Sequence, residues 1–542
     1  MSSVKSKAMY LFPHRGEQLR QLTVQDTHLE WVSKHLYLGV VIDQRLTFKP
    51  EINYLRDRAN SRLNVMKAMT NPTAGASSTV LRLFYIHAIR PLIDYAAPAL
   101  SAIAPTWMDQ LEVVQNRALR TILGAPTWTH TGTMQAETGI IPLGLRTKQL
   151  TAGQVATTLL HGRPSIVRDC LEGFYDIAHN DTRKWGPRTA AAFALMVDDG
   201  PQLAVNPDLP DHRYNPPPPW ETPAITFTST SLPGTRAECT GPEMRQHALR
   251  DMAELQITGT LCYYTDGSVD PSSGATGSAF VFSNMATAWR NSDHLSSLQT
   301  ELAAIDGALL HAEGGPGTSV IIFTDSKAAI QTLQRRHHTD NVALVTSILG
   351  QAQILTNQGV HIRIHWVPSH VGLTGNEAAD TAARQATQYE HITCLVRPSL
   401  SHTKVEAKAK ARGLTRNIHD MMAITSPSMR WYKDVTDYTP LSPDPRLTRE
   451  TAVATQRLRL GYRTLGEIQP GRGTLTCAHC GTRNEVPLIH YLNSCPATAQ
   501  LRTPPLEDGP VGRIAAAAAI ARRAFENLDD LLPLLKQAPP PR

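Results

Sequence analysis

The sequence predicts an α/β central domain, with a mixed five-stranded sheet covered by helices, between two regions of different character. Short apolar runs between residues 259 and 290 follow one another like the strands of a meander, and later strands alternate with helices up to residue 388. Strands that pair first as hairpins and then alternate with helices form a mixed sheet with helices packed on it. The preceding region is mainly helical, and the following region ends in a small Cys/His-containing part.

The composition is that of a folded protein with several domains. The chain has 542 residues, 41% of them hydrophobic, which suggests about three domains. Acids outnumber bases in 259–387, and bases outnumber acids in 388–542, within a total charge of +6. This distribution fits a cation site beside a polyanion-binding surface, and ordinary solvated surface would also explain it.

The composition also argues against secretion and membrane insertion. The seven cysteines are scattered, and only Cys477 and Cys480 lie close together, which excludes a secreted disulfide framework. The N-terminal residues lack the apolar core of a signal peptide, and no run reaches the ~18 apolar residues of a membrane helix. We therefore expect a soluble intracellular protein of the cytoplasm, the nucleus or both, without a membrane partner and with an oligomeric state that the sequence leaves open.

The first 197 residues read as two short strands followed by helices. The apolar runs 8–12 and 36–42 are typical of strands. Apolar residues at spacings of three and four then predict amphipathic helices. These helices cover residues 52–66, 76–93, 106–123 and 140–195. Prolines interrupt every periodic pattern from about 198 to 245, which predicts a linker.

The central part alternates more regularly. Strands are expected at 261–265, 278–283, 286–290, 319–324 and 360–366. Helices are expected at 297–313, 326–336, 340–357 and from Asn376 onward. The first strand ends on Asp266-Gly267, which taken alone reads as the turn of a hairpin.

Four acids stand at the ends of these elements. Asp266 ends the first strand, Asp325 follows the strand 319–324, Glu301 lies in the first turn of a helix, and Asp380 follows Asn376 by four residues. Each also has an ordinary explanation. Asp266 could be a turn residue, and Asp325 could be the N-cap of the following helix. Glu301 could be a favourable charge near a helix start, and Asp380 could be a solvated helix residue.

Taken together, the acids favour a cation site. Adjacent strands that end at one sheet edge would bring Asp266 and Asp325 close together. Clustered carboxylates repel one another unless cations lie among them, and all-oxygen ligands suit Mg²⁺ or Mn²⁺. Two such ions about 4 Å apart can stabilise both the attacking water and the leaving oxygen of a phosphodiester.

The order of these motifs resembles type 1 ribonuclease H. The matching stretches are Thr265-Asp266-Gly267-Ser268, Gln299-Thr300-Glu301, Thr324-Asp325-Ser326, and Trp366 to Asp380 with His370 in its loop. The resemblance covers about residues 259–387. It implies hydrolysis of the RNA strand of RNA–DNA hybrids, leaving a 3′-hydroxyl and a 5′-phosphate.

The resemblance also implies a role for each matching side chain. Asp266 would bridge two Mg²⁺ (or Mn²⁺) ions, with Glu301 and Asp325 on one ion and Asp380 on the other. His370 would assist proton transfer or product release. Contacts to the hybrid would use 2′-hydroxyl and backbone groups, with contributions expected from three polar residues. These are Ser268, Ser326 and Asn376.

The flanks resemble the end of a reverse transcriptase from a non-LTR retrotransposon. Lys5 to Phe12 is similar to its last palm motif, His35 to Asp43 to its join with the thumb, and Val114 to Arg120 to the region after it. The Asp-Asp hairpin of that family belongs before these motifs, so we expect no DNA synthesis. Asp198-Asp199 does not replace it, because this pair follows the thumb-like helices.

This comparison divides the chain into seven parts. They are the palm-like end (1–50), the thumb-like helical region (51–197), the Pro-rich linker (198–257), the ribonuclease H domain (258–388), a basic helical region (389–470), a zinc knuckle (471–500) and an Ala/Pro-rich tail (501–542).

Four Cys and His residues near the C-terminus predict one structural Zn²⁺. Cys477, Cys480, His490 and Cys495 have the ligand types and local spacings of a tetrahedral site. Similar clusters end many retrotransposon proteins of this group. With the basic residues around it, this part could hold nucleic acid through phosphates. A reduced cysteine pair with an incidental histidine is the alternative.

Two functions from different classes follow from these patterns. The first is an active, metal-dependent ribonuclease in a retrotransposon-derived protein, acting on RNA–DNA hybrids. The second is a catalytically idle remnant that binds nucleic acid through its thumb-like helices and basic C-terminal region. A purely structural helical scaffold does not account for the order of the acids.

Overall fold

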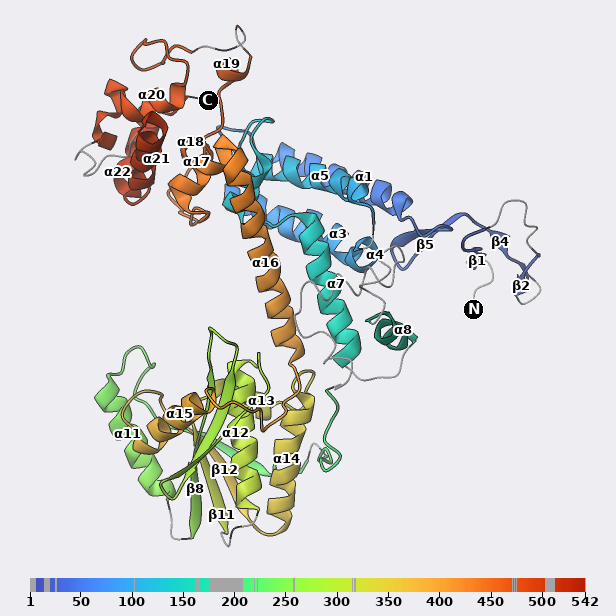
Figure 1. Cartoon of the computed structure of the whole chain (residues 1–542), viewed down its shortest axis with the longest axis vertical. Helices are drawn as coiled ribbons and strands as arrows, with labels where there is room; N and C mark the ends of the chain where they lie inside the picture. The colour runs from blue at the N-terminus through green and yellow to red at the C-terminus, as the bar shows by residue number, and fades with distance from the viewer. Residues whose placement is uncertain are drawn as a thin grey trace. The chain divides into compact units, whose positions relative to one another are not determined.

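The protein forms two compact units, and the first of them combines segments from both ends of the chain (Figure 1). The computed structural model describes residues 6–13, 20–24, 27–101, 103–160, 166–175, 208–218, 220–221, 223–256, 259–313, 315, 318–469, 471, 473, 475–502 and 512–541. Unit 1 comprises Met1–Thr151, Thr182–Ala192 and Lys408–Arg542, and unit 2 comprises Ala152–Asp181 and Phe193–Ala407. The predicted parts 51–197 and 389–470 therefore both contribute to unit 1.

Unit 2 contains a six-stranded sheet with the strand order β10-β9-β8-β11-β12-β7. The strands are β7 (Ile225–Ser229), β8 (Thr260–Val269), β9 (Thr276–Phe282), β10 (Met285–Arg290), β11 (Ser319–Thr324) and β12 (His361–Trp366). The strands β8, β9 and β10 pair antiparallel, whereas β8, β11, β12 and β7 pair parallel. The mixed sheet with helices is confirmed, but the predicted count of five strands is wrong by one.

The additional strand β7 lies in the segment that was predicted to be a linker. Its five residues pair with Ile362 to Trp366 of β12, and Pro223 and Pro233 flank it in the sequence. Helix α11 (Gly241–Leu255) follows, and the side chains of Thr240 and Glu243 form a capping box at its start. The linker prediction is wrong for these residues because pairing with a distant strand stabilises a run too short to be recognised locally.

Helices cover both faces of the sheet (Figure 1). On one face, α12 (Ser297–Ala312), α13 (Lys327–Leu333) and α14 (Val342–Asn357) pack over a core that includes Val320 and Ile322 of β11. On the other face, α11 packs with Ile321 and Phe323 of the same strand, beside α15 (Thr374–Ala386). Successive side chains of a strand point to opposite faces, so β11 supplies both cores.

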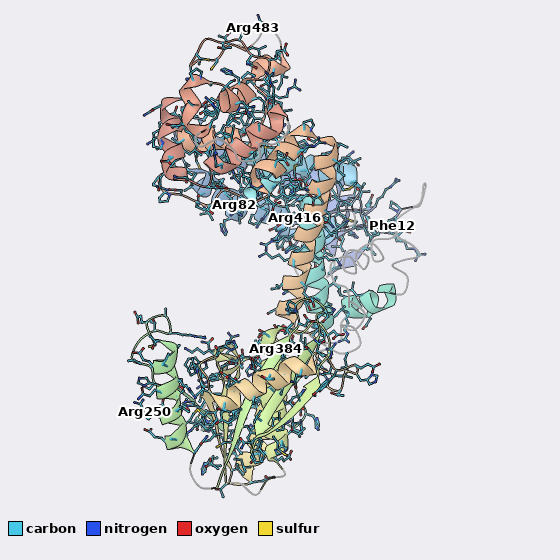
Figure 2. All side chains as sticks on the ribbon, turned by 60° about the vertical axis from the view of Figure 1, so that its left-hand side comes forward. Phe12, Arg82, Arg250, Arg384, Arg416 and Arg483 are labelled. Carbon is cyan, nitrogen blue, oxygen red and sulfur yellow. The ribbon has the colours of Figure 1, made fainter. Side chains whose placement is uncertain are left out.

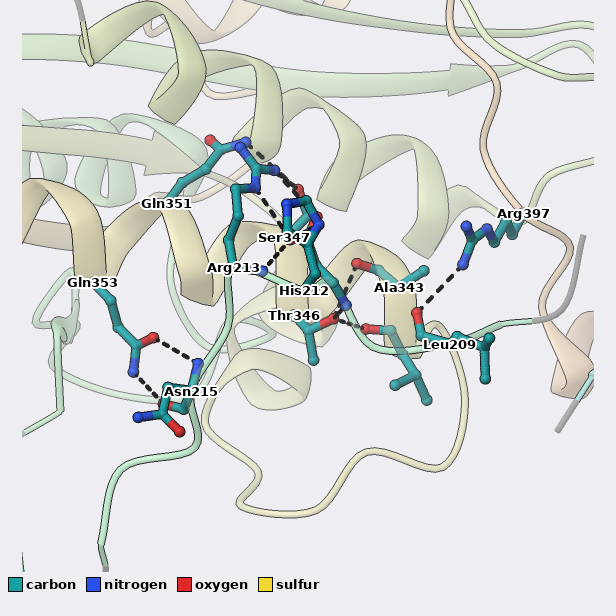
Figure 3. Close-up of polar contacts among 12 residues, drawn as sticks. Leu209, His212, Arg213, Asn215, Ala343, Thr346, Ser347, Gln351, Gln353 and Arg397 are labelled. Carbon is teal, nitrogen blue, oxygen red and sulfur yellow. Dashed lines mark hydrogen bonds and ion pairs between the residues drawn. The ribbon is translucent and has the colours of Figure 1, made fainter. Parts of the chain in front are cut away.

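Residues 208–215, which were also predicted to be part of the linker, form hydrogen bonds along helix α14. The carboxylate of Asp208 accepts hydrogen bonds from the N–H groups of Val342 and Ala343 at 2.8 and 2.7 Å, at the start of this helix. Further along, the N–H of Asp211 donates to Thr346 Oγ1 at 2.7 Å, and Asn215 exchanges two hydrogen bonds with Gln353 (Figure 3). The predicted Asp198-Asp199 pair lies outside the described residues.

The elements that precede the sheet are short strands and helices. The strands are β1 (Lys7–Ala8), β2 (Thr23–Val24), β3 (Thr27–His28), β4 (Glu30–Trp31), β5 (Lys34–Tyr37) and β6 (Val40–Asp43). The helices are α1 (Lys49–Ala68), α2 (Ser78–Phe84), the π-helical turn η2 (Tyr85–Ile89), α3 (Arg90–Tyr95), α4 (Ala97–Leu100), α5 (Pro105–Leu123), α6 (Thr131–Thr138), α7 (Leu143–Leu160) and α8 (Ile166–Tyr175).

The structure corrects one strand and confirms one helix in this region. The predicted strand 36–42 is a hairpin of β5 and β6, because Leu38 and Gly39 adopt φ values of 47° and 82° and reverse the chain. The apolar stripe of the helix predicted at 52–66 is buried in α1, as its spacing requires. Its residues are Ile52, Leu55, Ala59, Leu63 and Met66.

The elements after the sheet are helical. They are α16 (Leu400–Thr425), α17 (Pro427–Thr436), α18 (Arg449–Leu460), α19 (Leu465–Ile468), α20 (Pro487–Asn493), the 3₁₀ segment η3 (Pro496–Arg502), α21 (Arg513–Ala524) and α22 (Leu528–Gln537). No helix in the described ranges combines the length and apolar character needed to span a bilayer.

A buried polar centre joins early and late segments within unit 1. The carboxylate of Glu137 on α6 accepts hydrogen bonds from Arg459 Nε at 2.9 and 3.0 Å, from Tyr432 Oη at 2.8 Å and from Gln456 Nε2 at 2.8 Å. These partners come from α17 and α18, about 300 residues later in the chain. Because Glu137 and Arg459 are both buried, their ion pair holds these distant segments in one specific arrangement.

Candidate active site

Asp266 and Asp325 lie side by side because their strands are parallel neighbours in register. Thr265 of β8 pairs with Thr324 of β11, so the next residue on each strand is an aspartate at the same sheet edge. The predicted juxtaposition therefore holds. The prediction that Asp266 ends its strand is wrong, because β8 runs on to Val269 and pairs with β9 through this stretch.

Gly267 serves close packing rather than a turn. A Cβ atom at this position would overlap the backbone and side chain of Thr300 and the backbone of Glu301. Its absence lets α12 approach β8, which brings Glu301, in the second turn of that helix, next to Asp266. Gly375 similarly lets α15 approach β8, because a Cβ atom at position 375 would overlap the ring of Tyr264 on that strand.

Three carboxylates consequently form one cluster. One oxygen each from Asp266, Glu301 and Asp325 lies within 4.8 Å of the others. Burial, followed by the charge of Asp325, raises the pKa of Asp266 to about 7. Burial and the nearby Asp266 raise the pKa of Glu301 well above its usual range. A hydrogen bond between these two groups lowers the pKa of Asp266 and raises that of Glu301, so Glu301 holds the proton.

The donor set fits a divalent cation. All its atoms are carboxylate oxygens, which Mg²⁺ and Mn²⁺ prefer. Among the described residues, Glu301 Oε2 and Asn376 Oδ1 are buried without a hydrogen-bond partner. A buried acceptor without a donor is costly, and a bound cation would satisfy it.

Two residues of the 366–380 motif lie around Asp325. Asn376 on α15 is buried and donates through Nδ2 to Asp325 Oδ2 at 3.3 Å. His370 is exposed in the loop between β12 and α15, with φ 55°, and its charge lowers the pKa of Asp325, whose net shift is upward through burial. Asn376 therefore contacts Asp325 directly, and His370 affects it electrostatically.

Asp380 lies beside the cluster rather than within it. Its charge raises the pKa of both Asp266 and Asp325, but it is not one of the three carboxylates within 4.8 Å. Arg384, labelled in Figure 2, lies one turn further along α15. It donates to both Asp380 oxygens at 2.9 and 2.8 Å. The sequence reasoning missed Arg384, although its i+4 spacing from Asp380 is a recognisable signal.

The two serines occupy different positions near the cluster. Ser268 lies on β8, two residues after Asp266, and is partly exposed. Ser326 is the N-cap of α13, where its hydroxyl accepts a hydrogen bond from the N–H of Ala329 at 3.2 Å. Ser326 therefore has a structural duty in addition to the predicted substrate contact.

The predicted zinc ligands also come together. Ligand atoms of Cys477, Cys480, His490 and Cys495 lie within 4.8 Å of one another. Cys480 Sγ lies 3.2 Å from His490 Nε2, and Cys477 Sγ lies 3.8 Å from Cys495 Sγ. Three sulfurs and one nitrogen suit tetrahedral Zn²⁺.

Hydrogen bonds and burial shift the pKa values of two thiols in this second cluster. Hydrogen bonding with Thr482 lowers the pKa of Cys480 to about 6, whereas burial raises the pKa of Cys495 to about 11. Ser494 Oγ lies 3.1 Å from His490 Nδ1, which leaves Nε2 for the thiols. Such a partner on the second ring nitrogen orients a metal-binding histidine. The sequence reasoning did not identify Ser494.

The segment of the predicted zinc knuckle also takes part in a buried core. Helix α20 contributes Leu488, Tyr491 and Leu492 to a buried cluster with residues of α17, α18, α21 and α22. Packing with distant helices supplies this core, so the local sequence does not show it.

Comparisons with known proteins agree with the central assignment. The family model described as RNase H matches residues 259–388. The chain is 27% identical over 109 residues to the probable RNA-directed DNA polymerase from transposon BS of Drosophila melanogaster, covering 20% of this chain and 12% of that protein. It is 24% identical over 129 residues to the RNA-directed DNA polymerase from mobile element jockey of Drosophila funebris, covering 24% of this chain and 14% of that protein.

A viral relative shows the same extent of similarity. The Pol polyprotein of caprine arthritis encephalitis virus (strain Cork) is 32% identical over 131 residues, covering 24% of this chain and 11% of the polyprotein. The chain thus spans only about an eighth of the curated relatives that it matches. The sheet, the order of the acids and these similarities agree, and residues 259–388 belong to the RNase H family.

Proposed function

We propose that residues 259–388 hydrolyse the RNA strand of RNA–DNA hybrids with the help of divalent cations. The observation that carries this proposal is the convergence of Asp266, Glu301 and Asp325 within 4.8 Å on two parallel strands and one helix. The RNase H family match supports the substrate class. Mg²⁺ or Mn²⁺ bound there would act as a Lewis acid on the phosphodiester and increase the acidity of water.

The chain's own residues would hold the cations and control protons. Asp266, Glu301 and Asp325 would be the ligands of the cluster, with Asp380 as an adjacent ligand once it separates from Arg384. The proton that Glu301 shares with Asp266 would leave as cations bind, because a positive charge favours both carboxylates. Asn376 would keep Asp325 in position, and Ser268, Ser326 and Asn376 would contact the hybrid.

His370 is proposed to transfer protons during hydrolysis or to help release the product. The support is that His370 is exposed in the loop before α15 and that its charge lowers the pKa of Asp325. We expect His370→Ala to lower kcat by about 100-fold with little change in KM. The control is His361→Ala, an exposed histidine at the start of β12. A kcat equal to that of this control would contradict the role of His370.

The substrate class can be tested with one RNA in three forms. The purified chain would be incubated with Mg²⁺ and a labelled RNA paired with DNA, paired with RNA, or single-stranded. We expect cleavage of the hybrid only. Equal cleavage of the single-stranded RNA would contradict the proposal, and binding without cleavage of the hybrid would favour the idle nucleic-acid-binding remnant.

A structural zinc ion is proposed for the second cluster, with Cys477, Cys480, His490 and Cys495 as ligands. The support is the arrangement of four suitable atoms with Ser494 behind His490. The ion would hold the turn at 477–481 against the end of α20. The basic residues nearby would give this part a role in holding nucleic-acid phosphates.

Removal of one zinc ligand should abolish metal binding without unfolding unit 1. We expect one zinc ion per chain in the purified protein and none after Cys477→Ser, because a structural zinc ion requires four ligands. Unit 1 should stay folded, because the helices of this region share a buried apolar core. Elemental analysis and thermal melting would measure this. Cys170→Ser, at an exposed cysteine, is the control. A zinc-free wild-type protein would remove the proposal.

The remaining proposals concern the setting of this activity. We propose that the chain acts on nucleic acid inside the cell, in the cytoplasm, the nucleus or both. Localisation of a fluorescently tagged chain, with secretion into the medium as the opposing result, would test this.

A further inference from the structure

A hollow next to the carboxylate cluster is partly built by β7, outside the residues that match the RNase H family. Its volume is about 610 Å³. Its walls are β7 and the loop after it, the first turns of α13, and Trp366 at the end of β12. We call it the β7 hollow. Its lining therefore combines the family domain with the segment before it.

The β7 hollow is rich in hydrogen-bond donors and positive charge. Lys327 and Arg236 supply cations, Ser229 supplies a hydroxyl and Gln331 supplies an amide, with a second amide beside it. The hydroxyl of Thr228 is already hydrogen-bonded to His365. None of the described residues that line it is acidic. Glu238 accepts a hydrogen bond from the N–H of the lining residue Thr235 but does not itself line the hollow.

The two cations are not neutralised by neighbouring acids. In the described part of the chain, neither Lys327 nor Arg236 forms an ion pair. The Nζ atom of Lys327 lies 3.9 Å from the centre of the Trp366 ring, and Arg236 donates to Ser369 Oγ at 2.7 Å. These contacts orient the cations while leaving their charge for an anion.

The β7 hollow shares a wall with the active site. The indole N–H of Trp366 donates to the backbone oxygen of Asp325 at 3.0 Å, and Lys327 follows Asp325 by two residues. Ser369, the partner of Arg236, immediately precedes His370. The β7 hollow therefore lies beside the backbone of Asp325 and the loop that carries His370.

We propose that the β7 hollow binds a backbone phosphate of the nucleic acid whose RNA strand is cleaved. This inference rests on the proposed function for the choice of ligand. Each strand of a double helix presents a phosphate for about every 3.4 Å of rise, so a second phosphate lies within reach of a neighbouring site. Charged and amide donors bind phosphate oxygens and fix the position of the duplex without reading its sequence.

The test inserts a negative charge into the β7 hollow and measures hybrid binding without cleavage. Gln331→Glu changes an exposed side chain to a near-isosteric acid. Gln358→Glu is the matched control, an exposed glutamine before β12, at the opposite end of that strand from Trp366. Both changes would be made in the Asp266→Asn background, and the Kd for a labelled hybrid would be measured by fluorescence anisotropy.

We expect Gln331→Glu to raise the Kd about 10-fold, against less than 2-fold for Gln358→Glu, since an acid replaces a donor near a phosphate. Equal effects of the two changes, with equal melting temperatures, would overturn the proposal. Because binding is measured in a non-cleaving background, failure of the β7 hollow and failure of catalysis are separate results. If the wild type cleaves the hybrid but Gln331→Glu does not change the Kd, the proposal for the β7 hollow fails while the proposed function is retained.

Two further measurements identify the source of the phosphate. Lys327→Gln should reduce the slope of log Kd against log salt by about 1, as expected for one lost phosphate contact. Inorganic phosphate, titrated against the wild type, tests binding of a free anion. Binding of inorganic phosphate with an unchanged salt slope for Lys327→Gln would contradict the assignment to the nucleic-acid backbone.

Discussion

Replacement of Asp266 by asparagine is expected to reduce the rate of hybrid cleavage by ~1,000-fold or more. The change keeps the shape of a side chain that is 7% exposed and removes a charge from the centre of the carboxylate cluster. Loss of cation binding there would remove several kcal/mol of transition-state stabilisation, and about 4 kcal/mol corresponds to this factor. Single-turnover cleavage of a labelled hybrid measures the loss.

The matched control is Glu313→Gln, which neutralises one exposed acid just beyond the end of α12, away from Glu301. We expect its rate to remain within a factor of two of the wild type, as is usual for exposed positions away from a site. Equal rates for Asp266→Asn and this control would contradict the assignment of Asp266.

The same substitution should stabilise the metal-free protein. The pKa of Asp266 is raised from 3.8 to about 7, so between these values the folded protein binds a proton that the unfolded chain has released. The free energy of unfolding therefore falls as pH rises through this window. In the presence of a chelator, we expect a higher melting temperature for Asp266→Asn at pH 8 and no difference below about pH 4. A lower melting temperature at pH 8 would contradict this electrostatic account.

The largest expected effect on stability concerns Glu137. Glu137→Ala should lower the free energy of unfolding of unit 1 by about 3–5 kcal/mol, because it leaves a buried arginine without its partner. Arg459 is 5% exposed and donates to both Glu137 oxygens, and Tyr432 and Gln456 lose their acceptor as well. Chemical denaturation followed by circular dichroism would measure the change.

Two variants separate the ion pair from a general effect of substitution. Asp420→Ala removes a half-exposed partner of Lys433 and should cost less than about 1 kcal/mol. The double variant Glu137→Met with Arg459→Met should be more stable than Glu137→Ala, because no buried charge remains unpaired. A double variant less stable than Glu137→Ala would show that packing, and not charge, dominates this centre.

The proximity of the carboxylates could be predicted because it depends on regular elements. Asp266 and Asp325 follow apolar runs that form neighbouring parallel strands, so strand pairing alone brings them together. Glu301 and Asn376 follow from helices that begin at recognisable positions next to these strands. The proximity of the four cysteine and histidine residues could also be predicted, because two of them lie in one turn and the other two lie in or just after one short helix.

The features that could not be predicted depend on contacts between distant segments. Strand β7 is stabilised by pairing with β12, more than 130 residues later in the chain. Its own five residues are too few to predict a strand from their pattern. The role of Gly267 depends on the approach of α12, which no local pattern reveals. By contrast, the capping box of Thr240 and Glu243 was present in the sequence, and α11 could have been predicted from it.

The central claim is that the carboxylate cluster uses a divalent cation to cleave the RNA strand of a hybrid. The most direct measurement is cleavage of one hybrid labelled on both strands, with the purified chain treated with chelator and then titrated with Mg²⁺. The account predicts that only the RNA strand is cut, leaving 3′-hydroxyl and 5′-phosphate ends, and that the rate rises from zero to saturation with the cation. Cleavage that persists in chelator, or equal cutting of the DNA strand, would contradict it.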